Sequence, residues 1–397
     1  MADGIERRAR YRILTLNNLS ARGLERLPRE RYEVGPEVTE PQAILVRSAD
    51  MHSMPVPSTL LAVGRAGAGV NNIPVAALAR RGIPVFNAPG ANANAVKELV
   101  LAGLFLAARN ICPAWSFARS LSGDDEAIDA AVEAGKKKFV GFELPGRTIG
   151  VVGLGAVGVE VANAALALGM KVLGYDPQIT VQRAWQLSSN VEQALSLDDL
   201  FARADVVSVH VPLNAETRGL VSEPRLKVMR KGGVILNFAR APIVDDRSVV
   251  AALDDGRLRG YVCDFPSNAL KDHPRVVTLP HLGASTNEAE ENCAVMVADT
   301  VREYLENGNV RHSVNYPEAV LPRVAGATRL AIANSNVPNM VGQISTRLAS
   351  ASLNIADLLN KSRGEYAYTL IDTDGAVSED LLGKIRRIDG VLSARLI

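Results

Sequence analysis

The chain contains few of the residues that build disulfide frameworks and metal centres. Its 397 residues include three cysteines and five histidines. Cys112, Cys263 and Cys293 are widely spaced and form no Cys-x-x-Cys pair, which argues against both a disulfide framework and a zinc site. The histidines form no ligand-spaced cluster, so we expect no metal site. This cysteine usage favours a reduced, cytoplasmic protein.

The chain also lacks a long apolar run and an excess of charge of either sign. Its longest apolar stretch, residues 99–108, is far shorter than the roughly 20 residues of a membrane span. Residues 1–7 contain no apolar signal-peptide core, so we expect no secretory signal. The net charge of +1 argues against a nucleic-acid-binding or membrane-surface role. A hydrophobic content of 47% allows sizeable cores.

The most informative motif is a glycine-rich turn between an expected strand and an expected helix. Residues 151–158 are Val-Val-Gly-Leu-Gly-Ala-Val-Gly, and an Ala-rich stretch follows over 159–168. A second apolar run, 170–175, ends at Asp176. The order strand, glycine turn, helix, strand, acid is typical of a dinucleotide-binding unit. The residues expected around the cofactor phosphates are Gly153, Gly155, Ala156, Val157 and Gly158.

Each residue type in this motif has a physical reason. Gly153 permits the tight turn, Gly155 lets the backbone approach a pyrophosphate, and Gly158 allows close packing of helix and sheet. The helix N-terminus offers unpaired N–H groups to the phosphates. Asp176 can accept hydrogen bonds from ribose hydroxyls and would repel a 2′-phosphate, so the motif predicts NAD rather than NADP. A second glycine-rich stretch, 64–69, has Asn72 at the third position and is assigned to a loop near the substrate.

Short apolar runs alternate with helical stretches over most of the chain. Residues 94–110 predict a helix that is apolar and therefore buried, and 288–307 predict a second long helix. The expected parallel strands are 13–16, 43–46, 61–63, 83–86, 149–153, 171–175, 206–209, 234–237, 261–263 and 276–279.

After a proline-containing linker the pattern changes. Residues 330–397 predict strand, helix, two strands, helix and strand, the order of a ferredoxin-like fold in a small, separate domain. The fold class is therefore α/β, with two Rossmann-like doubly wound parallel sheets and a small C-terminal α+β domain. The expected division is a substrate-binding domain over 1–93 and 283–311, an NAD-binding domain over 94–282, a linker over 312–326 and the small C-terminal domain over 327–397.

Two polar side chains follow expected strands of the NAD-binding domain. Arg240 comes just after the strand at 234–237, where open α/β sheets bind ligands. Its guanidinium can grip a carboxylate through two N–H bonds, although a surface ion pair with Asp245 or Asp246 is an equal alternative. His281 follows the strand at 276–279, and its imidazole can exchange a proton near neutral pH. A hydrogen-bonded loop histidine is the alternative.

Together, these two side chains and a nicotinamide site suit one reaction. Oxidation of a 2-hydroxy acid needs a cation for the carboxylate, a base for the hydroxyl proton and a hydride acceptor. His210, in His-Val-Pro-Leu after the strand at 206–209, is expected near the cofactor. We assign it a packing or positioning role, because His281 has the setting that suits catalysis.

These motifs resemble the D-isomer-specific 2-hydroxyacid dehydrogenases over essentially the whole chain. The matching stretches are residues 63–73, 153–158, 237–240 and 280–286. The last of these, Pro-His-Leu-Gly-Ala-Ser-Thr, and the C-terminal domain resemble the members that act on 3-phosphoglycerate. The C-terminal part resembles an ACT domain, which in this family can sense L-serine at a dimer interface.

The resemblance implies a role for each matching residue. Arg240 would bind the substrate carboxylate and carbonyl, and His281 would be the acid/base. The implied substrate contacts are Arg47, Arg65, Gly67 and Asn92, with Arg47 at the phosphate. Asp264 would hold the nicotinamide carboxamide. The other implied cofactor contacts are His210, Val211, Pro212, Thr217, Ala239 and Gly283.

The chain departs from the family pattern at the position of a catalytic glutamate. The family usually has Asp-Val-Phe-x-x-Glu-Pro, whereas residues 264–269 are Asp-Phe-Pro-Ser-Asn-Ala, with Asn268 in place of the Glu. An amide can orient an imidazole but cannot stabilise its protonated form with a full charge. We therefore expect a less stabilised His281 cation, unless Asp272 or Glu288 substitutes.

A second departure lies in the effector loop, which in the family is His-x-Asn-x-Pro-Gly. Here it is Asn-Ser-Asn-Val-Pro-Asn, so Asn334, Asn336 and the more distant Asn354 are the candidate L-serine contacts, with a purely dimerising domain as the alternative. The implied activity is NAD-dependent oxidation of 3-phosphoglycerate in serine synthesis by a homodimer or homotetramer. The alternatives are a hydroxypyruvate or glyoxylate reductase, and a non-catalytic NAD-sensing protein on the same scaffold.

Overall fold

The computed structural model describes residues 10–397, so the segment 1–7, from which we expect no secretory signal, lies outside the described residues. The described chain divides into two compact units, one made of residues 10–92 with 287–397 and the other of residues 93–286. Within residues 10–397, no helix combines the length and apolar character needed to cross a membrane.

The first unit contains a five-stranded parallel sheet in the order β2-β1-β3-β4-β5. Its strands are β1 (Tyr11–Leu16), β2 (Tyr32–Gly35), β3 (Ala43–Val46), β4 (Ala62–Arg65) and β5 (Val85–Phe86). Its helices are α1 (Ala21–Leu24), α2 (Val75–Ala79) and the long α11 (Asn287–Asn307). The predicted strands are present, and β2 is an additional edge strand.

A four-stranded antiparallel sheet completes this unit, in the order β14-β15-β13-β16. Its elements are β13 (Thr328–Ser335), α12 (Met340–Ser350), β14 (Ile355–Arg363), β15 (Tyr366–Thr373), α13 (Glu379–Arg386) and β16 (Val391–Leu396). This order is the ferredoxin-like split βαβ that the sequence predicts.

The C-terminal sheet does not have a core of its own on both faces. Leu330 and Ile332 of β13 pack in a cluster with α12 and α13. The alternate residues Ala331 and Ala333 belong to a different cluster, which includes Tyr304 of α11 and the first sheet. Because successive side chains of a strand point to opposite faces, one face of this sheet is buried against α11. The expected separate domain is therefore joined to the N-terminal part through a shared core.

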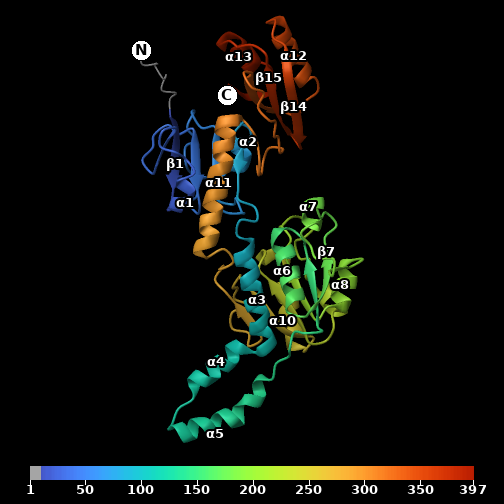
Figure 1. Ribbon diagram of the computed structural model, residues 1–397. Helices are drawn as coiled ribbons and strands as arrows, with labels where there is room; N and C mark the ends of the chain where they lie inside the picture. The colour runs from blue at the N-terminus through green and yellow to red at the C-terminus, as the bar shows by residue number, and fades with distance from the viewer. Residues whose placement is uncertain (1–9) are drawn as a thin grey trace. The chain divides into compact units, whose positions relative to one another are not determined.

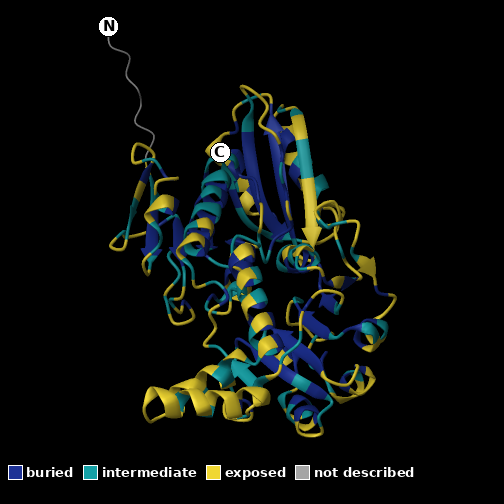
Figure 2. Ribbon diagram, turned by 60° about the horizontal axis from the view of Figure 1, so that its bottom comes forward, coloured by how far each residue is buried: buried dark blue, intermediate teal, exposed yellow. Residues whose placement is uncertain are grey.

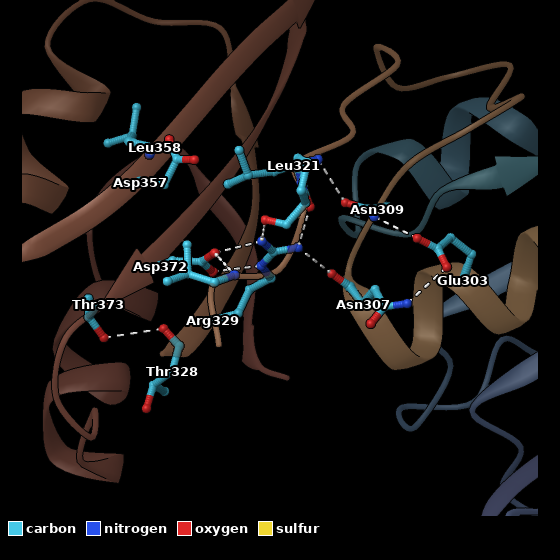
Figure 3. A network of polar contacts seen from close by, with 12 residues as sticks. Glu303, Asn307, Asn309, Leu321, Thr328, Arg329, Asp357, Leu358, Asp372 and Thr373 are labelled. Carbon is cyan, nitrogen blue, oxygen red and sulfur yellow. Dashed lines mark hydrogen bonds and ion pairs between the residues drawn. The ribbon is translucent and has the colours of Figure 1, made fainter. Parts of the chain in front are cut away.

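A buried arginine ties the two parts of this core together (Figure 3). The side chains of Arg329 and Asp372 are 0% and 1% exposed, respectively. The Nε and Nη2 of Arg329 donate to the two carboxylate oxygens of Asp372 at 2.7 and 2.6 Å. Its Nη1 donates to the carbonyls of Asn307 and Leu321 at 3.1 and 2.8 Å, and Nη2 also donates to that of Pro322 at 2.8 Å. All five N–H groups of the guanidinium therefore have an acceptor.

The second unit is built on a seven-stranded parallel sheet in the order β12-β11-β10-β9-β6-β7-β8. Its strands are β6 (Thr148–Val152), β7 (Lys171–Tyr175), β8 (Glu192–Gln193), β9 (Val206–Val209), β10 (Gly233–Asn237), β11 (Leu258–Cys263) and β12 (Val276–Thr278). The strand order reverses between β6 and β9, which is the switch point where such sheets bind ligands. Together with the first sheet, this arrangement confirms the predicted fold class.

Helices cover both faces of this sheet, as its apolar strands require. They include α3 (Ala93–Arg109), α6 (Ala156–Ala167), α7 (Val181–Ala184), α8 (Leu197–Arg203), α9 (Glu223–Val228), η2 (Ala241–Ile243) and α10 (Asp246–Asp254). The predicted helix at 94–110 is present as α3, but only one of its faces is buried, and Phe105 is 40% exposed. The sequence predicted that this helix is buried, because its apolar content does not reveal which face packs against the sheet and which face is exposed.

Two helices after α3 extend away from the sheet, as Figure 1 shows. They are α4 (Ile111–Ser120) and α5 (Asp125–Gly135), followed by the short helix η1 (Lys136–Phe139). No residue of α4 and only Gly135 of α5 is buried, and Figure 2 shows both helices mostly as exposed. Trp115 on α4 is 61% exposed. The sequence did not lead us to expect these helices.

Candidate active site

The glycine loop between β6 and α6 requires glycine at two positions. Gly153 has φ +89°, and a Cβ there would lie 2.8 Å from the carbonyl oxygen of His210. A Cβ on Gly158 would lie 1.9 Å from the carbonyl oxygen of Gly153, so larger residues would push the helix off the turn. A Cβ on Gly155, in contrast, would meet nothing within 4 Å. The loop therefore leaves open space at the first N–H groups of α6, which no side chain caps.

Asp176 follows β7 and lies beside the glycine loop. Its carboxylate accepts hydrogen bonds from the backbone N–H of Leu154 at 2.8 Å and of Gln178 at 2.9 Å. A carboxylate has about four acceptor sites, so capacity remains for ribose hydroxyls. The open space at Gly155 and this acid fit a dinucleotide, and the residues that would hold it are those of the glycine loop and Asp176.

His210 lies across the switch point from the glycine loop. Its backbone N–H donates to the carbonyl of Val152 at 2.7 Å, and its Nε2 is 2.8 Å from the Oγ of Ser208. Burial of the imidazole lowers the pKa of His210 to about 4. A neutral, hydrogen-bonded ring supports a positioning role for His210. After Val211, the loop is closed by the Oγ1 of Thr217, which donates to the carbonyl of Pro212 at 2.6 Å.

Arg240 follows β10, and its local turn is shaped by a buried amide. Asn237 is 0% exposed; its Oδ1 accepts from the N–H of Ala239 at 3.1 Å, and its Nδ2 donates to the carbonyl of Arg240 at 3.1 Å. The Nη1 of Arg240 donates to the carbonyl of Ala239 at 2.6 Å. Sequence reasoning assigned Asn237 no role, although an asparagine ending an apolar strand signals a turn.

The guanidinium of Arg240 forms no ion pair with any carboxylate in residues 10–397. The two acids offered as alternative partners are engaged elsewhere: Asp245 accepts from Ser248, and Asp246 accepts from Ser267 at 2.8 Å. An unpaired, half-buried guanidinium at the carboxyl edge of a parallel sheet can bind an incoming carboxylate.

The loop that carries His281 is held by Asp264, which is 1% exposed. The carboxylate of Asp264 accepts from the N–H groups of Leu282 and Gly283 at 2.7 and 2.8 Å. The backbone carbonyl of Asp264 accepts from the backbone N–H of His281 at 3.1 Å. His281 itself has φ +58°, a conformation that non-glycine residues rarely adopt. Asp264 therefore fixes the loop, besides any contact that it makes with a cofactor.

The imidazole of His281 meets an aromatic ring rather than a carboxylate. Its ring centroid lies 5.2 Å from that of Phe265, edge on. In the described part of the chain, no hydrogen bond joins the His281 side chain to Asn268, which is exposed. Asp272 is paired with Lys271, and Glu288 lies in the other unit. The contact with Phe265 was not foreseen from the sequence.

The predicted phosphate-binding side chains lie in the first unit. Arg47 follows β3 and forms an ion pair with Glu290 of α11. The Nε of Arg65 donates to the carbonyl of Arg47 at 3.1 Å, and a Cβ on Gly67 would lie 2.3 Å from Nη1 of Arg65. The structure thus brings Arg47, Arg65 and Gly67 together, while Asn92 lies just before α3. The carboxylate of Glu290 is a neighbour that sequence reasoning missed.

The three candidate effector residues do not meet within one chain. Asn336 follows β13 and donates to the carbonyl of Gly364 at 3.0 Å. Asn354 precedes β14, whose first residue pairs with Thr373 at the opposite end of β15. Asn334 is 1% exposed. A site made from all three would need residues from two copies of the chain.

Comparison with known proteins places this site in a family. Residues 111–283 match the model described as D-isomer specific 2-hydroxyacid dehydrogenase, NAD binding domain. The chain is 33% identical over 352 residues to D-3-phosphoglycerate dehydrogenase of Haemophilus influenzae, covering 85% of this chain and 81% of that protein. It is 32% identical over 383 residues to D-3-phosphoglycerate dehydrogenase of Methanocaldococcus jannaschii, covering 92% of this chain and 69% of that protein.

A solved structure gives the same result. The NAD⁺-bound 3-phosphoglycerate dehydrogenase of Entamoeba histolytica superposes with a TM-score of 0.60 at 25% identity, over 77% of this chain and 99% of that one. The chain belongs to the D-isomer-specific 2-hydroxyacid dehydrogenases, a family of NAD-dependent oxidoreductases. The predicted family membership and NAD as cofactor are confirmed.

Proposed function

We propose that this chain oxidises D-3-phosphoglycerate to 3-phosphooxypyruvate with NAD, the first step of phosphorylated L-serine biosynthesis. The observation that carries the proposal is the guanidinium of Arg240, which no carboxylate neutralises in residues 10–397. It lies at the carboxyl edge of the seven-stranded sheet, as do the glycine loop and the His281 loop. The curated relatives described above support the choice of substrate.

Each side chain has one task in this proposal. Bound NAD supplies the hydride acceptor. Arg240 holds the substrate carboxylate through two N–H groups and stabilises the developing carbonyl oxygen. His281 accepts the hydroxyl proton, and Asp264 keeps its loop in place. Arg47 and Arg65 supply positive charge for the phosphate, with Gly67 and Asn92 adding backbone or amide contacts.

Asn268 makes the proton transfer testable by itself. A carboxylate at this position would favour the protonated imidazole, whereas the amide does not. We expect Asn268→Glu to move the acid limb of the pH–rate profile for oxidation to higher pH by about one unit. An acid limb that stays in place, or moves to lower pH, would contradict the assignment of Asn268 to the usual glutamate position.

One observation favours a different substrate. Glu290 neutralises Arg47, which weakens the case for a phosphate and suits a reductase for hydroxypyruvate or glyoxylate. The purified protein should be assayed for NADH formation with D-3-phosphoglycerate and for NADH consumption with hydroxypyruvate and with glyoxylate. We expect kcat/KM to favour the phosphorylated substrate by about 100-fold, as ionic contacts to a phosphate allow. Turnover of glyoxylate without turnover of D-3-phosphoglycerate would establish the reductase instead.

We also propose a cytoplasmic homodimer or homotetramer that L-serine inhibits. The dependence on NAD and the three free thiols support the cytoplasm. Exposed apolar residues such as Trp115 on α4 support assembly. Asn336 and Asn354 lie at opposite ends of the C-terminal sheet, so they could form an effector site only across two copies. Titration of the activity with L-serine tests this, and a flat response up to millimolar serine would favour a purely dimerising C-terminal domain.

A further inference from the structure

A cavity lies at the opposite edge of the seven-stranded sheet from the glycine loop. Its volume is about 690 Å³. All pairs in this sheet are parallel, so the loops that lead into β6, β9, β10, β11 and β12 converge at one edge. These loops and η1 line the cavity. Substrates and cofactors of such sheets bind at the carboxyl edge, so this cavity is distinct from the candidate active site.

The lining of the cavity is strongly cationic. A cation comes from nearly every loop that reaches it, and the six are Lys138, Arg147, Arg230, Lys231, Arg259 and Arg275. Asp205 is the only acid among the lining residues, which leaves a surplus of five positive charges. The whole chain has a net charge of only +1, so this concentration is a local feature. Like charges held together repel, and they persist where an anion offsets them.

Aromatic and backbone contacts hold two of these guanidinium groups in place. The guanidinium carbons of Arg147 and Arg259 lie 4.4 and 5.3 Å from the centre of the Phe142 ring. The Nη2 of Arg259 donates to the carbonyl of Val140 at 2.5 Å. Such stacking fixes the planar groups before a ligand arrives.

One polar atom of this cluster lacks a partner. The Nε of Arg259 is buried and forms no hydrogen bond within residues 10–397. Asp205 offsets only one of the six cations, because its carboxylate lies 3.6 Å from Nη1 of Arg230 and also accepts from the N–H of Thr148 at 2.8 Å.

We propose that this cavity binds a small polyanion that carries at least two phosphoryl groups. Guanidinium groups bind phosphoryl oxygens in pairs, and the lysines add mobile positive charge. A single phosphate could not reach cations contributed by so many loops. The volume lies within the roughly 300–1,000 Å³ of ordinary ligand sites, which suits an extended, multiply charged molecule.

The test is calorimetric titration of the full chain with sodium tripolyphosphate at physiological ionic strength. Saturating NADH is included so that the phosphate site of the glycine loop is already filled. We expect saturable binding of one tripolyphosphate per chain. Lys231→Glu and, separately, Lys138→Glu should each weaken this binding about tenfold, since each replaces an attraction by a repulsion close to the anion. Both side chains are exposed, so the fold should tolerate the changes.

Lys227→Glu on α9 is the matched control, because Lys227 is an exposed lysine of the same unit that does not line this cavity. It should leave the affinity nearly unchanged. Absence of saturable binding, or equal weakening by the control, would overturn the proposal. So would a lower assembly mass of Lys231→Glu by light scattering, since a second copy of the chain would then fill the cavity. The results of the binding and light-scattering experiments are independent of the NADH assays that test the proposed function.

Discussion

Two arginines of this molecule have opposite surroundings. Arg329, under the C-terminal sheet, is fully buried, and its five N–H groups all have acceptors, including both oxygens of Asp372. Arg240, at the carboxyl edge of the seven-stranded sheet, has one backbone acceptor and no carboxylate partner in the described chain. A guanidinium that the protein satisfies completely stabilises the fold, whereas one left largely unsatisfied is available to a ligand.

The largest effect should come from Arg240. In Arg240→Gln the substrate carboxylate loses its charged partner, so kcat/KM for D-3-phosphoglycerate should fall at least about 10³-fold, which is about 4 kcal/mol. Because Arg240 has few contacts, the urea midpoint should change little. Steady-state kinetics and urea unfolding of the same preparation measure both. If Arg240→Gln lost stability but kept its activity, Arg240 would be a structural arginine and not a ligand-binding one.

Arg329 should show the complementary result. Arg329→Met leaves the carboxylate of Asp372 buried without its cationic partner, so the free energy of unfolding should fall by about 3 kcal/mol or more. The folded fraction should keep its kcat. The double variant Arg329→Met/Asp372→Leu removes the stranded charge and should recover most of the loss. If both variants were equally unstable, the carbonyl contacts rather than the ion pair would carry the stabilisation.

Burial also changes the protonation of His210, which makes the stability of the protein depend on pH. Burial lowers the folded-state pKa of His210 to about 4, below the value of about 6.5 in an unfolded chain. The unfolded state therefore binds the proton more readily between these values, and stability falls as pH decreases. From pH 7 to pH 5 the loss should be about 2 kcal/mol. His210→Gln should remove this part of the pH dependence, and urea unfolding at both pH values measures it.

Arg47 is the intermediate case, because it is 39% exposed and has one carboxylate partner, Glu290. Glu290→Gln frees the guanidinium for a phosphate, so KM for D-3-phosphoglycerate should fall about threefold, with little change for glyoxylate. Glu291→Gln, which removes the neighbouring acid from its pair with Arg22, is the control. An unchanged KM for D-3-phosphoglycerate in Glu290→Gln would argue that Arg47 does not bind the phosphate.

The local patterns of the sequence predicted most of the strands and the two long helices, but not which side chains of different elements lie in contact. The glycine motif and the strand-ending residues Arg240 and His281 were recognisable because a parallel sheet brings its carboxyl ends to one edge. The contact between Phe265 and His281, and the pairing of Arg47 with Glu290, involve side chains whose proximity depends on tertiary packing. Hydrophobic periodicity identifies one strand or helix at a time, so it does not show which side chains of distant elements come into contact.

The helices α4 and α5 were missed for a related reason. Both helices are short and amphipathic, but no residue of α4 and only Gly135 of α5 is buried in the described chain, so the apolar faces of these helices pack against no core that the sequence pattern could indicate. The basic cavity was also not expected, because its cations are distributed over loops from residue 138 to residue 275. In the sequence, these cations resemble ordinary solvated charges, and only the parallel arrangement of the strands gathers them.

The shared core under the C-terminal sheet has a practical consequence for deletion experiments. Ending the chain before Thr328 would leave Tyr304 and Tyr316 without the aromatic ring of Tyr368. It would also leave the carbonyl of Asn307, at the last turn of α11, without the guanidinium that it receives from Arg329. Loss of activity in a truncated protein could therefore come from loss of stability rather than loss of regulation, and point substitutions at Asn336 and Asn354 are a cleaner probe of any effector.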